Sequence, residues 1–263
     1  PNETNSFSIN YNKRINRPSY SRLNPFRWYN NPFSYSEGNP FLQPSFSNNI
    51  ELNYTFNDNW SNSIYYSHTD NGFEQITIVD NTDNIQKTIA QNIFKTTIIG
   101  VSESYTYNKL KWLSSTFSFD WNYSKSESLI PITNQNLNGS NAYFSTTNDF
   151  NLNKNKTLLF NISYWYNFKG TSDLDKNNAY SQLDASIKYF AFDKKLQISF
   201  NANDILSTNR PIYTSFTNNI QIDYKNYYDV RLFRLSLVYK FGNKNINVEK
   251  KEVGNQEEKE RTN

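Results

Sequence analysis

Short polar turns divide this chain at nearly regular intervals, and a long loop lies between each turn and the next. The four turns are Asn57-Asp58-Asn59, Asn108-Lys109-Leu110, Lys154-Asn155-Lys156 and Asp193-Lys194-Lys195. Each interval holds one strand-like run, a loop rich in Asn, Ser and Thr, and a second strand-like run. The spacing therefore predicts an antiparallel up-and-down sheet with all short turns at one end and all long loops at the other.

The strand-like runs alternate between apolar and polar residues, with exceptions such as Leu159 and Trp165 on a polar face. In Leu158–Lys169, Phe160 and Tyr164 fall on one face, and Asn161 and Ser163 fall on the other. A period of two is the pattern of a strand with one apolar and one polar face. It predicts ten strands, at Ser6–Arg14, Asn49–Phe56, Trp60–Ile78, Ile93–Tyr107, Lys111–Ser124, Ala142–Leu152, Leu158–Lys169, Ala179–Phe192, Leu196–Ile205 and Val230–Phe241.

The composition indicates where such a sheet would lie. Aromatic residues make up 17% of the chain, yet the mean hydropathy is −0.81. The strands approach the ~9–11 residues that a membrane strand needs, whereas soluble sandwich strands are commonly ~5–6 residues long. Aromatic residues crowd the short-turn ends, as in an interfacial girdle: Phe56, Trp60, Tyr107, Tyr239 and Phe241. We predict an all-β, transmembrane antiparallel up-and-down β-barrel; the alternative is a soluble β-sandwich with an aromatic core.

The region 1–242 is predicted to form the barrel wall, with long outer loops at Ile15–Phe46, Val79–Asn92, Glu127–Asn141, Gly170–Asn178 and Ser207–Tyr227. The first loop combines prolines with aromatic residues, which predicts an ordered loop that packs on its neighbours or binds a ligand. Residues 243–263 lack aromatics and balance their charges, so we predict a disordered periplasmic tail.

Several classes of function are disfavoured by composition. The chain has no cysteine, which excludes disulfides and cysteine-based sites. Its net charge of +3 is small and the basic residues are scattered, so no nucleic-acid partner is predicted. The chain has no run of ~18 apolar residues, so no membrane helix is predicted. The chain contains no Met and no signal peptide, and we expect it to be a C-terminal piece whose export signal lies upstream.

His68 is the single histidine and the natural candidate for a hydrolase base. Asp70 and Ser67 lie close to it in sequence, near the outer end of a predicted strand. However, His68 shares a face with Ile64 and Tyr66, which is the side that would meet lipid. We therefore favour a plain interfacial histidine, predict no catalytic residue, and expect that the protein is not an enzyme.

An oxygen-rich cluster at Asp80, Asn81, Asp83 and Asn84 resembles a Ca²⁺ loop only in composition, because it lacks the spacing and the glycine. We predict no metal and no cofactor, since phosphate and dinucleotide motifs are also absent. The charged and amide side chains expected on the lumen face could tune the interior or merely hydrate it: Glu51, Asp120, Asn161, Lys169, Arg234 and Lys240. No ligand-binding residue is assigned among them.

Four segments carry a resemblance to a known family: Tyr11–Phe26 (YNKRINRPSYSRLNPF), Gly38–Phe56 (GNPFLQPSFSNNIELNYTF), Asn201–Leu206 (NANDIL) and Arg234–Gly242 (RLSLVYKFG). Together they resemble the C-terminal β-barrel of TonB-dependent receptors, specifically the outer-membrane β-barrel family related to SusC-like proteins. One departure is Ser45, where that family often has Glu.

The resemblance implies the last ten strands of a barrel of about 22 strands in the outer membrane. It further implies an upstream plug that contacts the TonB complex, a closing strand read by barrel-assembly machinery, surrounding membrane lipid, and import of a nutrient such as an iron chelate, glycan or peptide. Two alternatives remain open. One is a complete small barrel with a structural or adhesin role; the other is an outer-membrane hydrolase that uses His68.

Overall fold

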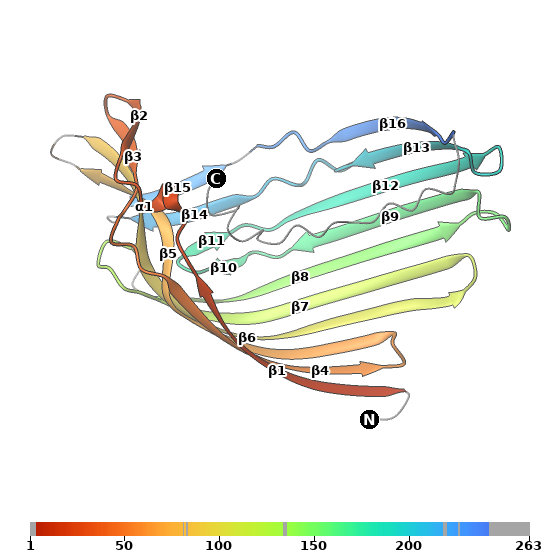
Figure 1. Ribbon diagram of the computed structural model, residues 1–263, viewed down its shortest axis with the longest axis horizontal. Helices are drawn as coiled ribbons and strands as arrows, with labels where there is room; N and C mark the ends of the chain where they lie inside the picture. Colours follow the sequence, from red (N-terminus) through yellow and green to blue (C-terminus); the bar gives the residue numbers. More distant parts are fainter. Residues whose placement is uncertain are drawn as a thin grey trace.

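The computed structural model describes residues 4–80, 82, 84–133, 136–217, 220–225 and 227–241 of the chain. The tail predicted for residues 243–263 lies outside the described residues. The elements follow one another as shown in Figure 1: β1 (Asn5–Asn16), α1 (Tyr20–Leu23), β2 (Arg27–Asn31), β3 (Ser34–Glu37), β4 (Ser45–Phe56), β5 (Trp60–Asp80), β6 (Ile85–Leu110), β7 (Leu113–Ser128), β8 (Asn136–Asn151), β9 (Leu158–Asn167), β10 (Gly170–Ser172), β11 (Asp175–Asn177), β12 (Tyr180–Ala191), β13 (Leu196–Asn203), β14 (Ile212–Thr217), β15 (Ile220–Lys225) and β16 (Leu232–Tyr239).

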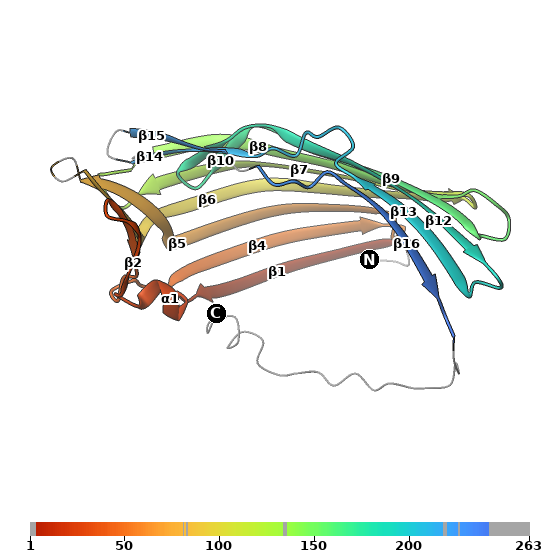
Figure 2. The same ribbon diagram turned by 90° about the horizontal axis from the view of Figure 1, so that it is seen from above.

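The long strands form one antiparallel sheet in the order β1-β4-β5-β6-β7-β8-β9-β12-β13-β16. The sheet is curved (Figure 2), and the prediction of an all-β, up-and-down architecture is confirmed. It does not close into a barrel. Within the described residues, β1 pairs only with β4 and β16 pairs only with β13, so each forms a free edge.

Each of the ten predicted strands is present, but β5 and β6 are longer than expected, with 21 and 26 residues. These lengths are about twice what a membrane crossing needs, and the hairpin extends past the rest of the sheet (Figure 1). The predicted loop Val79–Asn92 is therefore wrong, since most of it belongs to these two strands. The predicted loop Glu127–Asn141 is also too long, because β7 continues to Ser128 and β8 begins at Asn136. β-branched residues of the β5–β6 hairpin, such as Thr77 and Thr88, pair across it.

Three of the four predicted turns lie where the sequence placed them, between β4 and β5, β8 and β9, and β12 and β13. In the first, Asn57 and Asp58 have φ angles of 51° and 54°, which Asn and Asp tolerate better than most residues. The second turn lies later in the chain than predicted. β6 continues to Leu110, and the turn falls at Lys111 and Trp112. A register irregularity between Tyr107 and Leu110 adds one residue to β6 and moves the turn.

Aromatic side chains form a row at the short-turn end of the wall. Trp112 stacks on Phe150 with ring centroids 6.2 Å apart, and Phe150 contacts Phe160 on the next strand at 5.7 Å. Near the neighbouring turn, the Trp60 indole donates a hydrogen bond of 2.8 Å to Glu103. An apolar ring with a polar handle is suited to the boundary between lipid and water, as expected for a girdle.

The long loops contain structure that the alternation did not predict. The first loop holds α1, β2 and β3, and β3 pairs with β6 in parallel. The connections after β9 and β13 supply a second, four-stranded sheet in the order β10-β11-β14-β15. In the described part of the chain, no helix is long and apolar enough to cross a membrane.

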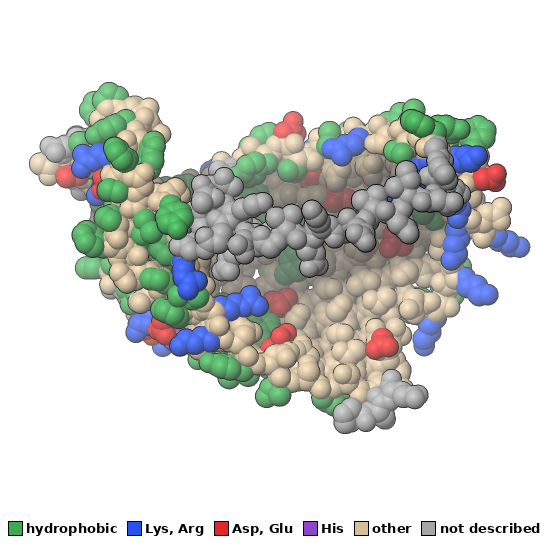
Figure 3. Space-filling model, viewed as in Figure 1, with side chains coloured by type: hydrophobic (Ala, Val, Ile, Leu, Met, Phe, Trp, Pro, Cys, Tyr) green, Lys and Arg blue, Asp and Glu red, His purple; other side chains and the backbone are tan. Residues whose placement is uncertain are grey.

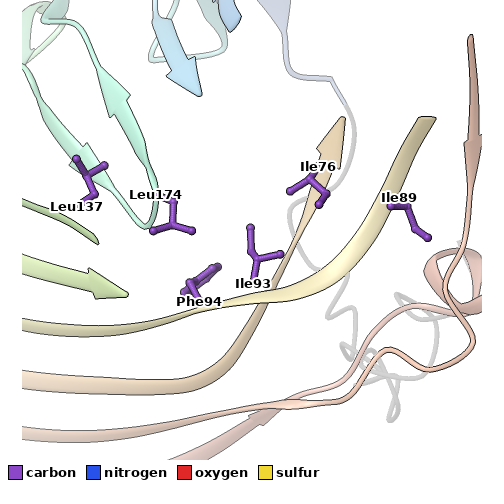
Figure 4. Packing of buried hydrophobic residues seen from close by; sticks show 6 residues of the cluster. All are labelled: Ile76, Ile89, Ile93, Phe94, Leu137 and Leu174. Atoms are coloured by element: carbon purple, nitrogen blue, oxygen red, sulfur yellow. The ribbon is translucent and has the colours of Figure 1, made fainter. Parts of the chain in front are cut away.

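Within the described residues, the clusters of buried apolar side chains lie at the long-loop end of the molecule. Figure 4 shows a cluster formed by Ile76, Ile89, Ile93, Phe94, Leu137 and Leu174. A smaller cluster joins Leu42 of the first loop to Phe73 and Ala90 of the β5–β6 hairpin. The first loop is thus ordered by packing, as one of its two predicted roles requires.

Gly38 allows two family-like segments of the first loop to meet. Its amide donates to the Asn24 carbonyl at 2.9 Å, and a Cβ at this position would lie 2.3 Å from that same oxygen. The next amide, of Asn39, donates to the Arg22 carbonyl at 2.6 Å. Since the neighbouring atoms belong to the backbone, no side-chain rotation could make room for a larger residue.

We predict that Gly38→Ala lowers the free energy of local opening of the first loop by about 1–3 kcal/mol, because the added methyl group overlaps the Asn24 carbonyl. The measurement is the rate of limited proteolysis within residues 17–44 of the detergent-solubilised full-length protein. Ser36→Ala, in the adjacent strand β3, is the control and should leave the rate unchanged. Equal cleavage of Gly38→Ala and the wild type would contradict the close packing.

Candidate functional site

The two faces of the main sheet differ in chemistry. On β4, Ile50 and Leu52 point to the convex face and are 44% and 49% exposed, while Glu51 and Asn53 alternate with them on the concave face. Figure 3 looks into this concave face, where most of the surface is neither hydrophobic nor charged and a few acidic side chains are scattered. Apolar residues outside and polar residues inside suit hydrocarbon on one side and water on the other.

A tyrosine crosses the concave wall between β5 and β7. The Tyr65 hydroxyl donates to both carboxylate oxygens of Asp120, each at 3.1 Å. Gly100 of β6 lies between them, and a Cβ there would be 2.3 Å from Tyr65 Cζ. The missing side chain at Gly100 therefore lets the ring lie across the wall and reach its acceptor.

Hydrogen bonds continue from Asp120 toward the long-loop end. Asn122 Nδ2 donates to Asp120 at 3.3 Å, and Asn141 Nδ2 donates to Asn122 Oδ1 at 2.9 Å. The backbone amide of Thr171 then donates to Asn141 Oδ1 at 2.7 Å. Because Thr171 belongs to β10, the polar row links the middle of the wall to the hairpin that follows β9.

The β10–β11 hairpin lies on the concave face instead of projecting away from it. The hydroxyls of Thr171 and Ser124 are 3.0 Å apart, which places β10 over β7. Further across, Thr96 Oγ1 of β6 donates to Asp173 Oδ1 at 3.2 Å. A Cβ at Gly139 of β8 would lie 2.7 Å from Thr171 Cγ2, so the close approach depends on this glycine.

One apolar side chain anchors the hairpin. Leu174, at its tip, is 5% exposed and joins the cluster of Ile93, Phe94 and Leu137. Burying a leucine contributes about 1.5–3 kcal/mol, and each of the polar contacts about 0.5–1.5 kcal/mol. Among the described residues, the hairpin is therefore held to the wall by this leucine and by a small number of hydrogen bonds.

A cavity of about 210 Å³ lies between this hairpin, the β5–β6 hairpin and β14. Its walls carry three carboxylates, from Glu74, Asp173 and Asp175, and among the described residues no Lys or Arg lines it. Burial raises the pKa of Asp173, and the hydrogen bond from Thr96 opposes that shift. Burial likewise raises the pKa of Asp175.

In the NANDIL segment, Asp204 forms a cluster of hydrogen bonds where the chain leaves β13. Asp204 is 2% exposed, and its carboxylate accepts the amides of Thr208 at 3.0 Å and Asn209 at 3.4 Å. Its own amide donates to Asp184 Oδ1 of β12 at 2.8 Å. This explains an acidic residue at this position by loop geometry, without any ligand.

Glu37 joins the first loop to β6 at the long-loop end of the wall, which we call the mouth. Its carboxylate accepts from Arg27 at 2.9 Å and also pairs with Lys87. The hydrogen bond from Lys87, followed by that from Arg27, holds the pKa of Glu37 below its usual range. These groups are satisfied by one another and support the parallel β3–β6 pairing.

His68 lies on the convex face, where the sequence placed it. Its Nδ1 is 2.9 Å from Thr97 Oγ1, and its Nε2 is 3.3 Å from Asp70 Oδ1. Ser67 belongs to the opposite face, where its hydroxyl donates to Asn49 at 2.6 Å. Strand alternation thus separates the serine from the imidazole, and no Ser-His-Asp arrangement forms from these residues.

The oxygen-rich cluster of the β5–β6 hairpin is described only in part, because Asn81 and Asp83 lie outside the described residues. Asp80 Oδ1 accepts the Thr82 amide at 2.8 Å, as in an Asx turn. Over the part of the chain that the structure describes, no group of three or more His, Cys, Asp or Glu side chains is placed to hold a metal ion.

The predicted lumen residues are spread along the wall and do not converge. Glu51 accepts from Ser63 at 3.0 Å, and Asn161 donates to Asp149 at 2.8 Å, each with its neighbouring strand. Arg234 pairs in register with Asn201 near the free edge. Lys169 and Lys240 lie just beyond the ends of β9 and β16, respectively. Only Asp120 belongs to the hydrogen-bonded row that reaches the hairpin.

Sequence reasoning missed Thr171, Asp173 and Leu174, which it placed in an undifferentiated loop. The available signal was an apolar Leu174 between two aspartates in a short polar loop. That pattern does not indicate which way the loop folds, and only the structure shows that it turns inward onto the wall.

Residues 1–239 match the outer membrane protein beta-barrel family. No curated protein matches the chain.

We predict that the hairpin docks more firmly as the pH falls. The pKa of Asp173 is raised by burial in the docked state, so docking is fully favoured below the ordinary pKa of an aspartate and weakens as the pH rises through the raised value. Asp175, shifted in the same direction, adds to the effect, while Glu74 is the nearby carboxylate that disfavours their charged forms.

The measurement is hydrogen-exchange protection of residues 171–176, corrected for intrinsic exchange, in the full-length protein at pH 4.5 and pH 7. Protection should be greater at the lower pH. Asp173→Asn should lose most of this difference, since an amide does not titrate. Identical pH dependence in the wild type and in Asp173→Asn would refute the assignment to this carboxyl.

Proposed function

Because the chain belongs to the outer membrane protein beta-barrel family, and therefore resides in the outer membrane, we propose that it forms the C-terminal wall of a TonB-dependent receptor that imports a nutrient. The nutrient classes that suit such a receptor are iron chelates, glycans and peptides. The proposed role is binding and passage of a solute, with no enzymatic step.

The observation that carries the proposal is the mostly polar concave face, which the stacked rings of Tyr143 and Trp165 interrupt. Its cross-strand contacts join short side chains, such as Thr106 with Thr116 at 3.1 Å and Ser104 with Ser118 at 3.4 Å. A closed barrel of few strands fills its interior with side chains. Short hydroxyl and amide groups leave space, which favours a wider barrel around a water-filled or plugged lumen.

The free edges support the same proposal. In hydrocarbon, each unsatisfied backbone group costs several kcal/mol, so an open sheet is not a stable wall. The edges at β1 and β16 therefore need partners. We propose that further strands continue the sheet beyond β1, and that the complete barrel of about 22 strands closes against β16.

In the proposed mechanism, the long-loop end faces outward and captures the nutrient. An upstream plug, drawn by the TonB complex, then moves and opens the lumen along the polar concave face. The apolar side of β16, with Leu235 and Leu237 exposed, meets lipid after the barrel-assembly machinery has inserted the sheet.

A second candidate is adhesion by a smaller barrel. It is favoured by the aromatic surface of the first loop, where Phe26, Tyr29 and Phe33 are 73%, 63% and 63% exposed. Such a patch of rings at the outer end is suited to contact with another surface.

Deleting the gene should abolish growth on one of the three nutrient classes supplied as the sole source, and the full-length gene should restore it. Inactivating the TonB protein of the same cell should have the same effect, because transport draws its energy from that complex. The measurement is uptake of a labelled iron chelate, glycan or peptide by each strain.

Unchanged uptake of all three classes in the deletion strain would contradict the transport proposal. Loss of surface attachment in that strain, with uptake intact, would favour the adhesin. A full-length gene that encodes no plug would exclude the active mechanism.

A further inference from the structure

The β10–β11 hairpin, residues 170–177, reaches far from the strand that leads into it. β9 neighbours β8, yet Thr171 contacts Ser124 on β7 and Asp173 contacts Thr96 on β6. The hairpin thus crosses three strands of the concave wall at its long-loop end. We call residues 170–177 the strap.

The seat of the strap is built into the wall. Gly139 and Gly170 allow close approach, since a Cβ at Gly170 would lie 2.1 Å from Asn141 Oδ1. Leu174 fills an apolar recess between β6 and β8. Ser124, beneath the strap, is only 3% exposed. The docked position is therefore specific and not a loop resting on a surface.

The strap is nevertheless separable from the wall. Within the described residues, its sheet shares no backbone ladder with the main sheet. Its polar contacts involve hydroxyl, amide and carboxylate side chains, whose hydrogen bonds water can replace. Undocking would therefore leave every strand pair of the wall intact.

The strap carries the next loop with it. Lys176 pairs with Thr214, and Asn177 pairs with Tyr213, which joins β11 to β14 and hence to β15. Two connections that leave the wall at different strands are thus one four-stranded unit. Displacement of the strap would shift this whole unit at the mouth of the concave face.

The acidic side chains behind the strap weaken its docking on the wall. Glu74 of the β5–β6 hairpin, Asp173 and Asp175 line the same cavity, and no described Lys or Arg lines it with them. Arg22 of α1 lies 4.0 Å from Glu74 and offsets part of its charge. The remaining like charges, in a partly dry space, oppose close contact. Apolar burial of Leu174 and a small number of hydrogen bonds hold the strap against this repulsion.

We propose that the strap is a displaceable gate, which narrows the outer mouth when Leu174 is seated and swings off the wall to admit a large solute. This gate rests on the proposed transport function, because a wall with no passage has nothing to gate. Motions of this kind suit a segment with few buried contacts on a rigid scaffold.

A disulfide can test the gate, because the chain has no cysteine of its own. In Gly139→Cys/Thr171→Cys, the two Cβ atoms would start 3.3 Å apart, close to the ~3.5–4.5 Å of natural disulfides. The matched control is Ser118→Cys/Ser145→Cys, a pair in register between β7 and β8. Both are made in the full-length protein in its outer membrane.

Oxidation of the strap pair should reduce uptake of the labelled nutrient about tenfold or more, and a reductant should restore it. The wall pair should show no such change. Equal uptake by the oxidised and reduced strap pair, with the disulfide verified, would overturn the gate alone. Absence of uptake by the wild type as well would overturn the transport function and, with it, the gate.

Thiol labelling tests docking without any need for transport. Ser124→Cys lies under the strap, whereas Ser118→Cys lies on the same face of β7 away from it. A membrane-impermeant thiol reagent should label Ser124→Cys about tenfold more slowly. Adding Leu174→Asp should remove this difference and leave Ser118→Cys unchanged. Equal labelling rates with an intact strap would refute the docked state.

Discussion

The wall of this protein depends on the backbone hydrogen-bond ladders between its antiparallel strands. In hydrocarbon no water can satisfy a peptide group, so each strand needs a partner on both sides. From β4 to β13 every long strand has two such partners. Because the ladders supply cohesion, the side chains need not form a central dry core. They are free to be apolar on the convex face and polar on the concave face.

Among the residues that the structure describes, clusters of buried apolar side chains lie where the wall ends and the loops begin. There the β5–β6 hairpin rises above the sheet and offers apolar side chains such as Ile76 and Ile93 on its inner side. The first loop and the strap each insert one leucine, Leu42 and Leu174, into such a surface. Loops that would otherwise be mobile are thus positioned by a rigid scaffold, which is where binding and gating are commonly found.

The wall and its long-loop end, the mouth, are held together in different ways. A polar concave wall held by ladders is rigid and suits passage of a solute. The mouth is held by isolated side-chain contacts, by close approach at glycines, and by carboxylates in a small cavity. Free energies of local opening are lowest where buried contacts are few. Conformational change is therefore expected at the mouth, while the wall keeps its shape.

The sequence by itself determined the ten long strands, their faces and the sides of the turns, because a period of two is a local pattern that each strand carries within itself. It also placed His68 on the face that would meet lipid, together with Ile64 and Tyr66. It misplaced the turn after β6, since a bulge leaves no mark on the alternation. Only the tertiary structure decided that the strap folds inward, because Thr96 and Asp173 lie 77 residues apart and meet through the curvature of the sheet and the space left by Gly139.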